Sequence, residues 1–313
     1  MLGKTAGGLF WMFRYLERSE NTARLLEAES RIALTRASSE GEDWDSVVST
    51  SGVRHSYCQK YDQFDATNVI DFLLRDPDNS SSVLAVVESA RNNARLVRTA
   101  LTREVWEAVN VCWMTLKDLL ANPVRVRELP EVLGTIRQQS ALVRGALHGT
   151  MMRNDIFDFA RLGMFVERAD NTARILDVKY YVLLPSVSYV GSSLDNVQWE
   201  IILRSVSAQG AYRWQNEGDI NPKGIARFLM LDRCMPRSLA FCYGKIVDNL
   251  SYLAEDYGMV HESHGQAATT FQRLRETPIE EVFDSGLHEF IEEFIRQNNL
   301  LGQQIQADYR FTG

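Results

Sequence analysis

The sequence predicts an all-α protein, a helical bundle of about 8–10 helices. Long segments carry apolar residues at intervals of three and four, which is the period of an amphipathic helix, and only 7 Pro interrupt the 313 residues. No stretch alternates apolar and polar residues for long enough to predict a sheet. The composition, with 45% hydrophobic and 24% charged residues, is that of an ordinary globular chain.

The periodic segments place the helices between breaks that are rich in Gly, Pro and polar residues. The predicted helices are 8–37, 64–75, 80–121, 129–149, 152–183, 194–212, 222–231, 235–256 and 279–308. Turn-rich residues predict loops at 38–62 and 184–193, and the Gly-flanked stretch around His261 and His264 also predicts a loop. Pro236 is expected to begin the helix that follows it.

None of the predicted loops is long or biased enough to be a flexible linker. We therefore expect a single domain, 1–313, which can be subdivided into a repeat-bearing bundle at 1–183 and C-terminal helices at 194–313. The net charge is -7 and the pI about 5.4, which does not favour nucleic acid or an anionic membrane as a partner. Within the 34 basic residues, however, only 6 are Lys, and this excess of Arg needs a reason.

An internal repeat is the most informative feature. Residues 17–24 are ERSENTAR, residues 88–95 are ESARNNAR and residues 167–174 are ERADNTAR, so all three share E-x-x-x-N-x-A-R. The apolar positions on both sides of each octapeptide also repeat, in a rhythm of three and four. The repeat predicts three equivalent long helices that pack together.

In each copy the Glu, Asn and Arg lie at i, i+4 and i+7, in one line along the helix and away from its apolar seam. Glu and Arg of one copy are ~10 Å apart along the axis, so we expect each Glu to meet an Arg of a neighbouring copy. The candidate residues, including the Arg that directly follows Glu in two copies, are Glu17, Arg18, Asn21, Arg24, Glu88, Asn92, Arg95, Glu167, Arg168, Asn171 and Arg174.

Two interpretations of these residues compete. In the first they form a buried network of Glu, Asn and Arg that fixes the register of the helices. In the second they line a groove in which Arg side chains hold a carboxylate or phosphate and Glu side chains act on cations, amines or protons. A structure with no cavity beside these side chains would exclude the groove.

Other kinds of site have no local support in the sequence. A dimetal centre in a helical bundle needs two Glu-x-x-His pairs, and none occurs, so we predict neither a metal nor another cofactor. The motifs GxxxxGK[ST], GxGxxG and GxSxG are also absent. The chain shows no signal peptide and no apolar run long enough to span a membrane, which by default places it in the cytoplasm.

Three longer segments extend beyond the octapeptides, namely GLFWMFRYLERSENTARLLE at 8–27, ARNNARLVRTALTREVWEAVN at 90–110 and FARLGMFVERADNTARILDVKYY at 159–181. These segments resemble the bacterial alpha-E family, an all-helical domain of unknown function with a Glu-Arg motif. The resemblance extends to WEIILRSVSAQGAYR at 199–213 and FLMLDRCMPRSLAFC at 228–242. It implies association with a circularly permuted ATP-grasp ligase, and with transglutaminase-like and proteasome-like peptidases.

This family context indicates a system that makes, attaches or removes a peptide or amide-linked tag. We expect an accessory protein that binds the ligase, a peptide or both, and that is not itself an enzyme. The alternative is an enzyme that acts on a peptide or amide through a Glu/Arg-lined groove. The middle copy has Ser89 where the others have Arg, so it is predicted to be the least functional of the three.

Overall fold

The structure, a computed structural model, describes residues 1–33, 40–181, 193–216 and 221–311. These residues form α-helices and two short 3-10 helices and contain no strand, which confirms the all-α prediction. The first half contains α1 (Gly3–Ala33), α2 (Glu40–Thr50), α3 (Arg54–Cys58), α4 (Ala66–Leu74), α5 (Val83–Leu96), η1 (Arg98–Ala100), α6 (Arg103–Leu119), η2 (Val126–Glu128), α7 (Leu129–Thr150) and α8 (Asp155–Tyr181). The second half contains α9 (Ser193–Ser205), α10 (Gln209–Gln215), α11 (Pro222–Leu231), α12 (Leu239–Tyr257), α13 (Glu262–Glu276), α14 (Ile279–Ser285) and α15 (Leu287–Asp308).

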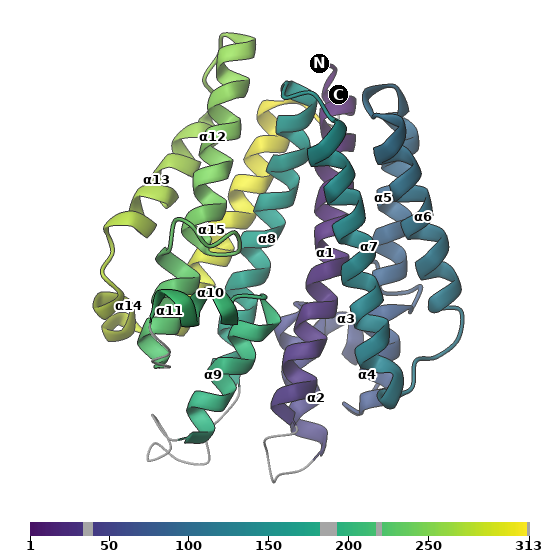
Figure 1. Cartoon of the computed structure of the whole chain (residues 1–313), viewed down its shortest axis with the longest axis vertical. Coiled ribbons are helices and arrows are strands. Elements are labelled where there is room, and N and C mark those ends of the chain that lie inside the picture. The colour runs from purple at the N-terminus through teal and green to yellow at the C-terminus, as the bar shows by residue number, and fades with distance from the viewer. Residues whose placement is uncertain (34–39, 182–192, 217–220, 312–313) are drawn as a thin grey trace.

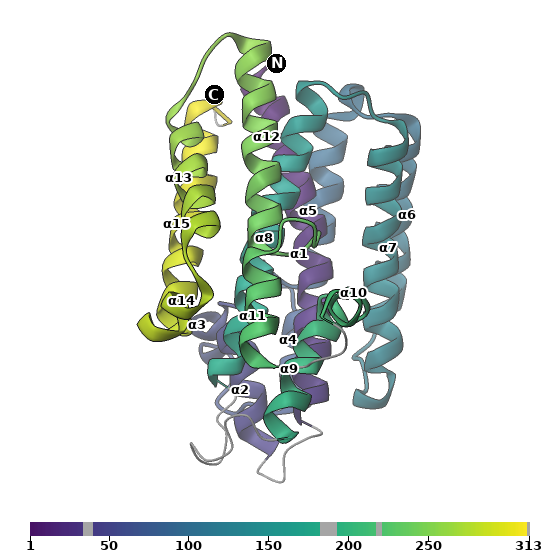
Figure 2. The same cartoon turned by 60° about the vertical axis from the view of Figure 1, so that its left-hand side comes forward.

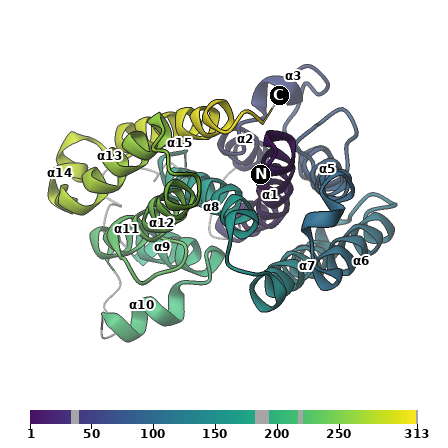
Figure 3. The same cartoon turned by 90° about the horizontal axis from the view of Figure 1, so that it is seen from above.

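Two long helices, α1 and α8, lie side by side at the centre of the bundle (Figure 1). On one side α5 and α7 pack against α1, and α6 packs on α5 and α7. On the other side α12 and α15 pack against α8 (Figures 2 and 3). Both central helices begin at the same end of the bundle, so they run parallel (Figure 1). Copies one and three of the repeat lie on these two helices.

The second copy lies on α5, which differs from the other two helices. It has 14 residues, against 31 in α1 and 27 in α8. It runs antiparallel to α1, because Val97 at its end packs against Gly8 near the start of α1. The three helices are therefore not equivalent, and only α1 and α8 can align their octapeptides residue by residue.

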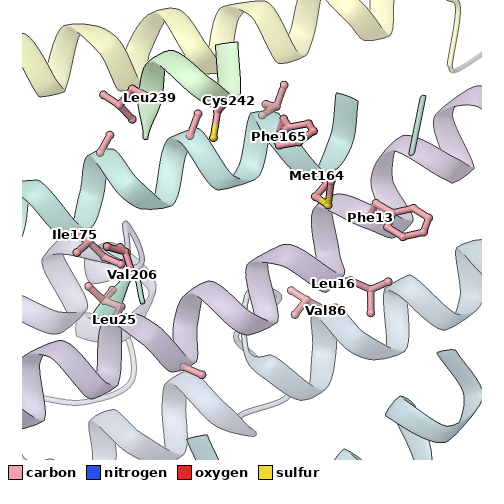
Figure 4. Close-up of a cluster of buried hydrophobic side chains, with 14 of the residues drawn as sticks. Phe13, Leu16, Leu25, Val86, Met164, Phe165, Ile175, Val206, Leu239 and Cys242 are labelled. Atoms are coloured by element: carbon pink, nitrogen blue, oxygen red, sulfur yellow. The ribbon is translucent and has the colours of Figure 1, made fainter. Parts of the chain in front are cut away.

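Apolar side chains fill the space between these helices. One continuous cluster of buried side chains draws on both 1–183 and 194–313. Figure 4 shows part of it, with Phe13 and Leu16 of α1, Val86 of α5 and Met164 of α8. No described helix has an apolar stretch of the length and hydropathy that crossing a membrane demands.

Several predicted helices are broken in the structure, which gives more helices than expected. The segment 80–121 divides because Thr102 caps a new helix, its hydroxyl accepting a hydrogen bond from the Val105 backbone N–H at 3.4 Å. The segment 194–212 divides near Ser207, where φ is 56°, and 279–308 divides at Gly286, where φ is 100°. The helix predicted from 235 begins at Leu239 instead, because Ser238 caps it.

The prediction of a loop at 38–62 was wrong. It contains α2 and α3, which are held by a few buried side chains, among them Val47, Val48 and Tyr57. The prediction of a loop around His261 was also wrong, because α13 begins at Glu262. Short amphipathic helices with few apolar residues are stabilised by packing, and local periodicity does not detect them. The predicted loop 184–193 and the end of the predicted helix 8–37 fall largely outside the described residues.

Candidate functional site

The register of α1 against α8 positions the candidate residues. Gly163 lets the two backbones approach closely, since a Cβ atom at this position would overlap the carbonyl oxygen of Phe10. Because the helices are parallel and in contact here, the Glu-Arg dipeptide of one copy lies opposite that of the other. The first and third octapeptides therefore face each other across the central interface.

The two dipeptides form a reciprocal pair of ion pairs. Arg168 donates from Nε and Nη2 to the two carboxylate oxygens of Glu17, at 2.8 and 2.9 Å. With the roles of the two helices exchanged, Arg18 donates from Nε and Nη2 to the two carboxylate oxygens of Glu167, at 2.5 and 2.9 Å. Both are bidentate, which is the geometry in which a guanidinium binds a carboxylate best. Glu17, Glu167 and Arg168 are buried, while the side chain of Arg18 is 28% exposed.

Further arginines surround Glu17. Arg144 of α7 lies 3.3 Å from its carboxylate, and Arg237, just before α12, also lies 3.3 Å away. Both also bind Glu20 of α1, which accepts a bond from Arg144 Nη1 at 2.7 Å. These contacts tie α7 and the start of α12 to the central pair of helices.

Glu167 has a second partner and a second layer of contacts. Arg14 Nε donates to its Oε2 at 2.9 Å. Asn21 donates from its amide to the backbone oxygen of Glu167 at 3.2 Å, and Asn171 donates to the backbone oxygen of Asn21 at 3.5 Å. The predicted Asn residues therefore join the backbones of α1 and α8. We define the Glu/Arg network as the side chains Arg14, Glu17, Arg18, Glu20, Arg144, Glu167, Arg168 and Arg237.

The spacing predicted that Arg24 and Arg174 would each bind the Glu of a neighbouring copy, and they do not. Arg24 binds Glu20 four residues before it, at 2.7 Å, and Arg174 binds Asp170 in the same way, at 2.6 Å. Each also binds a backbone oxygen of another segment, Ser205 for Arg24 and Thr50 for Arg174. The Arg partner of Glu17 and of Glu167 is instead the Arg that directly follows the Glu of the other copy.

The middle copy takes no part in this network. Glu88, Asn92 and Arg95 are exposed on α5, and their side chains form no hydrogen bond or ion pair with any residue that the structure describes. The structure therefore brings together the first and third copies and leaves the second on the surface. The repeated residues therefore form a buried network in the first and third copies and lie on a solvated helix face in the second copy.

The arginines keep the buried carboxylates ionised. Burial alone would raise the pKa of Glu17, but the charges of Arg168, Arg237 and Arg144 outweigh it and hold that pKa far below its usual range. The pKa of Glu167 is lowered for the same reason, with Arg18 and Arg14 opposing the effect of burial. Burial dominates at Arg237, where it lowers the pKa to about 10.

Acid should unfold this protein through these carboxylates. In the native state they stay ionised well below pH 4.5, whereas in the unfolded chain they bind protons near that pH, so the unfolded state gains protons first. Stability present above about pH 5 is therefore lost as the pH falls toward 2, by roughly 1.4 kcal/mol for each unit of pKa depression.

Urea unfolding at pH 7, 5, 4 and 3 measures this loss. Glu17→Gln should flatten the profile, whereas Glu107→Gln, in an exposed pair with Arg103, should leave it unchanged. A free energy of unfolding that is the same at pH 7 and pH 3 in the wild type would contradict the assignment.

A cavity of about 220 Å³ lies beside the network, next to Arg18, Glu167 and Arg174. Because a cavity does lie beside these side chains, the structure does not exclude the groove interpretation. Of the three copies, only the first and third adjoin the cavity, and the turn between α2 and α3 at Ser51–Val53 also lines it. A larger hollow of about 630 Å³ lies between α13 and α15, away from the repeat. Among the described residues no group of His, Cys, Asp and Glu is arranged to hold a metal ion.

A family model described as a predicted alpha-helical domain with a conserved ER motif, Alpha-E, matches residues 1–309. The chain belongs to the Alpha-E family. Uncharacterized proteins of Mycobacterium bovis and of two strains of Mycobacterium tuberculosis are each 23% identical to it over 307 residues. The match covers 92% of this chain and 34% of each relative, so the chain spans about a third of their length. No solved structure matches it.

In this Alpha-E protein the ER motif is a helix-pairing device, because each Glu of the motif binds the Arg of the other motif. Sequence reasoning missed four side chains of the Glu/Arg network, and it also missed Asp170, the partner of Arg174. The repeat held a signal for two of these five residues. Copies one and three share an acidic fourth residue, Glu20 and Asp170, which the middle copy lacks. Arg14, Arg144 and Arg237 lie outside the octapeptides, and no local pattern marks them.

Proposed function

We propose that this Alpha-E protein is a non-catalytic interaction domain of a system that forms amide bonds, and that it binds an ATP-grasp ligase. The observation that carries the proposal is that the carboxylates of both ER motifs are buried and held by guanidinium groups. Because Glu17 and Glu167 bind arginines of the opposite helix, they stabilise the packing of α1 against α8. The greater length of the relatives is a second support, since in them the matching segment shares a chain with other regions.

The alternative is an enzyme that uses the Glu residues of the motif as acid or base. Such a residue works best when its pKa lies near the operating pH. The pKa values of Glu17 and Glu167 lie far below neutrality, and each carboxylate already accepts bonds from two or more Arg side chains. This arrangement favours the interaction domain. Because the ligase consumes ATP, we place the complex in the cytoplasm, with peptidases of the transglutaminase-like or proteasome-like kind acting on its product.

The surface copy of the repeat is where we expect the partner to bind. Glu88, Asn92 and Arg95 form an exposed polar line on α5, and Leu96 beside them is 82% exposed. An exposed apolar side chain with polar residues around it matches the arrangement of an interface, in which a polar rim surrounds an apolar core. The copy that the sequence predicts to be least functional is thus the copy available to a partner.

Co-purification from the native organism tests the proposal. We expect the tagged protein to capture an ATP-grasp ligase, or to change the rate of that ligase when the two are mixed. The charge reversal Glu88→Arg/Arg95→Glu should reduce capture at least tenfold without changing the fold, because both side chains are exposed. The matched control is Arg103→Glu/Glu107→Arg on α6, which exchanges another exposed pair.

Absence of both capture and an effect on the ligase rate would overturn the association with a ligase. Equal capture by the α5 variant and the α6 control would instead overturn α5 as the contact surface. A turnover of peptide or amide by the isolated protein that Glu17→Gln abolishes, with the fold retained, would establish the enzyme alternative.

A further inference from the structure

The cavity beside the Glu/Arg network has two unlike walls. Arg14, Arg18 and Arg174 form a cationic wall, contributed by α1 and α8. Leu25, Val53 and Leu73 contribute apolar surface from α1, the α2–α3 turn and α4. The cavity, about 220 Å³, is smaller than the sites of about 300 Å³ and more that take drug-sized ligands. It therefore suits a small ligand with one charged end and one apolar end.

The charges on the cavity wall do not cancel. Three guanidinium groups line it, against the two carboxylates of Glu167 and Asp170. Each arginine is held in place by one of these carboxylates, so the cationic wall is fixed before any ligand arrives. One positive charge remains in excess, and a single negative charge on a ligand would balance it.

Some guanidinium donors on this wall are also unused. Arg18 donates to Glu167 through Nε and Nη2, and its Nη1 has no acceptor in the described part of the chain. Arg14 donates through Nε, and both of its Nη atoms likewise lack an acceptor there. Arg174 donates from Nη1 to the Thr50 backbone oxygen and from Nη2 to Asp170, so the second N–H of each Nη is left for a ligand. The side chains of Arg18 and Arg174 are 28% and 26% exposed, so an entering anion can reach them.

We propose that this cavity binds a small monocarboxylate with an aliphatic body, its carboxylate on Arg18 and Arg174 and its aliphatic group on Leu25, Val53 and Leu73. A carboxylate matches the single excess charge, whereas a phosphate dianion would face the neighbouring carboxylates of Glu167 and Asp170 with a second negative charge. The same carboxylate and aliphatic body occur at the C-terminal residue of a peptide and in a free aliphatic amino acid. The ammonium group of the free amino acid adds a positive charge that Glu167 and Asp170 would have to balance. The proposal does not depend on association with a ligase.

Calorimetric titration of the purified full chain tests the proposal with four probes. N-acetyl-L-leucine has the carboxylate, the aliphatic body and an amide in place of a free amine, as a peptide C-terminus does. N-acetyl-L-leucinamide lacks the carboxylate, and we expect it to bind at least tenfold more weakly. Inorganic phosphate should also bind at least tenfold more weakly than N-acetyl-L-leucine. L-leucine distinguishes the sources, since tighter binding than the acetylated form indicates a free amino acid and weaker binding a peptide end.

Variants locate the site. Arg174→Gln should weaken binding of N-acetyl-L-leucine at least tenfold. The matched control is Arg75→Gln, because Arg75 also binds an acid four residues earlier and a backbone oxygen of another segment, and its side chain is also 26% exposed. Val53→Trp should abolish binding by filling the cavity from the α2–α3 turn, without removing any ion pair of the network.

Several results would overturn the proposal. The first is that neither N-acetyl-L-leucine nor L-leucine shows saturable binding. The second is that N-acetyl-L-leucinamide binds as tightly as N-acetyl-L-leucine, and the third is that phosphate binds as tightly or more tightly. Unchanged affinity in Val53→Trp would show that the ligand binds elsewhere, and this variant decides the location if Arg174→Gln fails to fold. Loss of ligase capture alone, with probe binding intact, would leave the cavity assignment in place and overturn only the proposed function.

Discussion

Glu17→Gln should lower the free energy of unfolding by about 3–5 kcal/mol, the loss expected when one partner of a buried ion pair is removed. The Glu17 carboxylate accepts two bonds from Arg168 and lies within 3.3 Å of Arg144 and Arg237. A neutral amide leaves these three guanidinium groups in a buried site with one carboxylate fewer. The amide oxygen can still accept from one guanidinium group, but the amide N–H groups face donors and cannot replace the bonds of the second carboxylate oxygen.

Equilibrium unfolding in urea measures the change. The control on the same helix is Glu27→Gln, a carboxylate that binds Arg31 and Arg137 nearer the surface, for which we expect a loss below about 1 kcal/mol. Arg168→Lys keeps the charge but not the two-point geometry, and should be clearly less stable than the wild type. A Glu17→Gln protein within about 1 kcal/mol of the wild type would show that the network does not hold α1 and α8 together.

The pairing of the Glu-Arg dipeptides was only partly predictable. The repeat indicated that equivalent helices pack together and that a Glu of one copy binds an Arg of another copy. In the structure Glu17 and Glu167 form such pairs between copies. The spacing pointed to Arg24 and Arg174 as partners, because Glu and Arg at i and i+7 are too far apart to pair within one copy. A parallel pair in contact instead brings adjacent positions together, and helix direction cannot be read from periodicity.

The same limit applies to the middle copy and to the remaining arginines. The octapeptide on α5 has the repeat pattern, yet an antiparallel helix cannot present it in register to α1, so its polar residues are exposed. Arg144 and Arg237 lie far from the repeat in the sequence and reach Glu17 only through the packing of α7 and α12. The excess of Arg over Lys is thus partly a requirement of buried carboxylates for two-point partners.

Gly163→Ala should destabilise the protein by about 3 kcal/mol, although Gly to Ala in the middle of a helix normally stabilises by roughly 0.5–1 kcal/mol. A methyl group at this position would overlap the carbonyl oxygen of Phe10 and lie 3.1 Å from the Phe10 Cα. Backbone atoms cannot rotate away as a side chain can, so α8 must move from α1. That movement lengthens the bonds of Glu17 and Glu167 with the arginines of the opposite helix.

Gly145→Ala on α7 is the matched control, because nothing lies within 4 Å of the added methyl group. We expect it to raise the free energy of unfolding by about 0.5–1 kcal/mol, opposite in sign to Gly163→Ala. Gly163→Ala should also lose less stability than the wild type between pH 5 and pH 3, because the arginines bind the carboxylates of Glu17 and Glu167 less tightly in this variant. If both Ala variants were stabilised alike, the close approach of α1 and α8 at Gly163 would be wrong, and with it the geometry that aligns the two dipeptides.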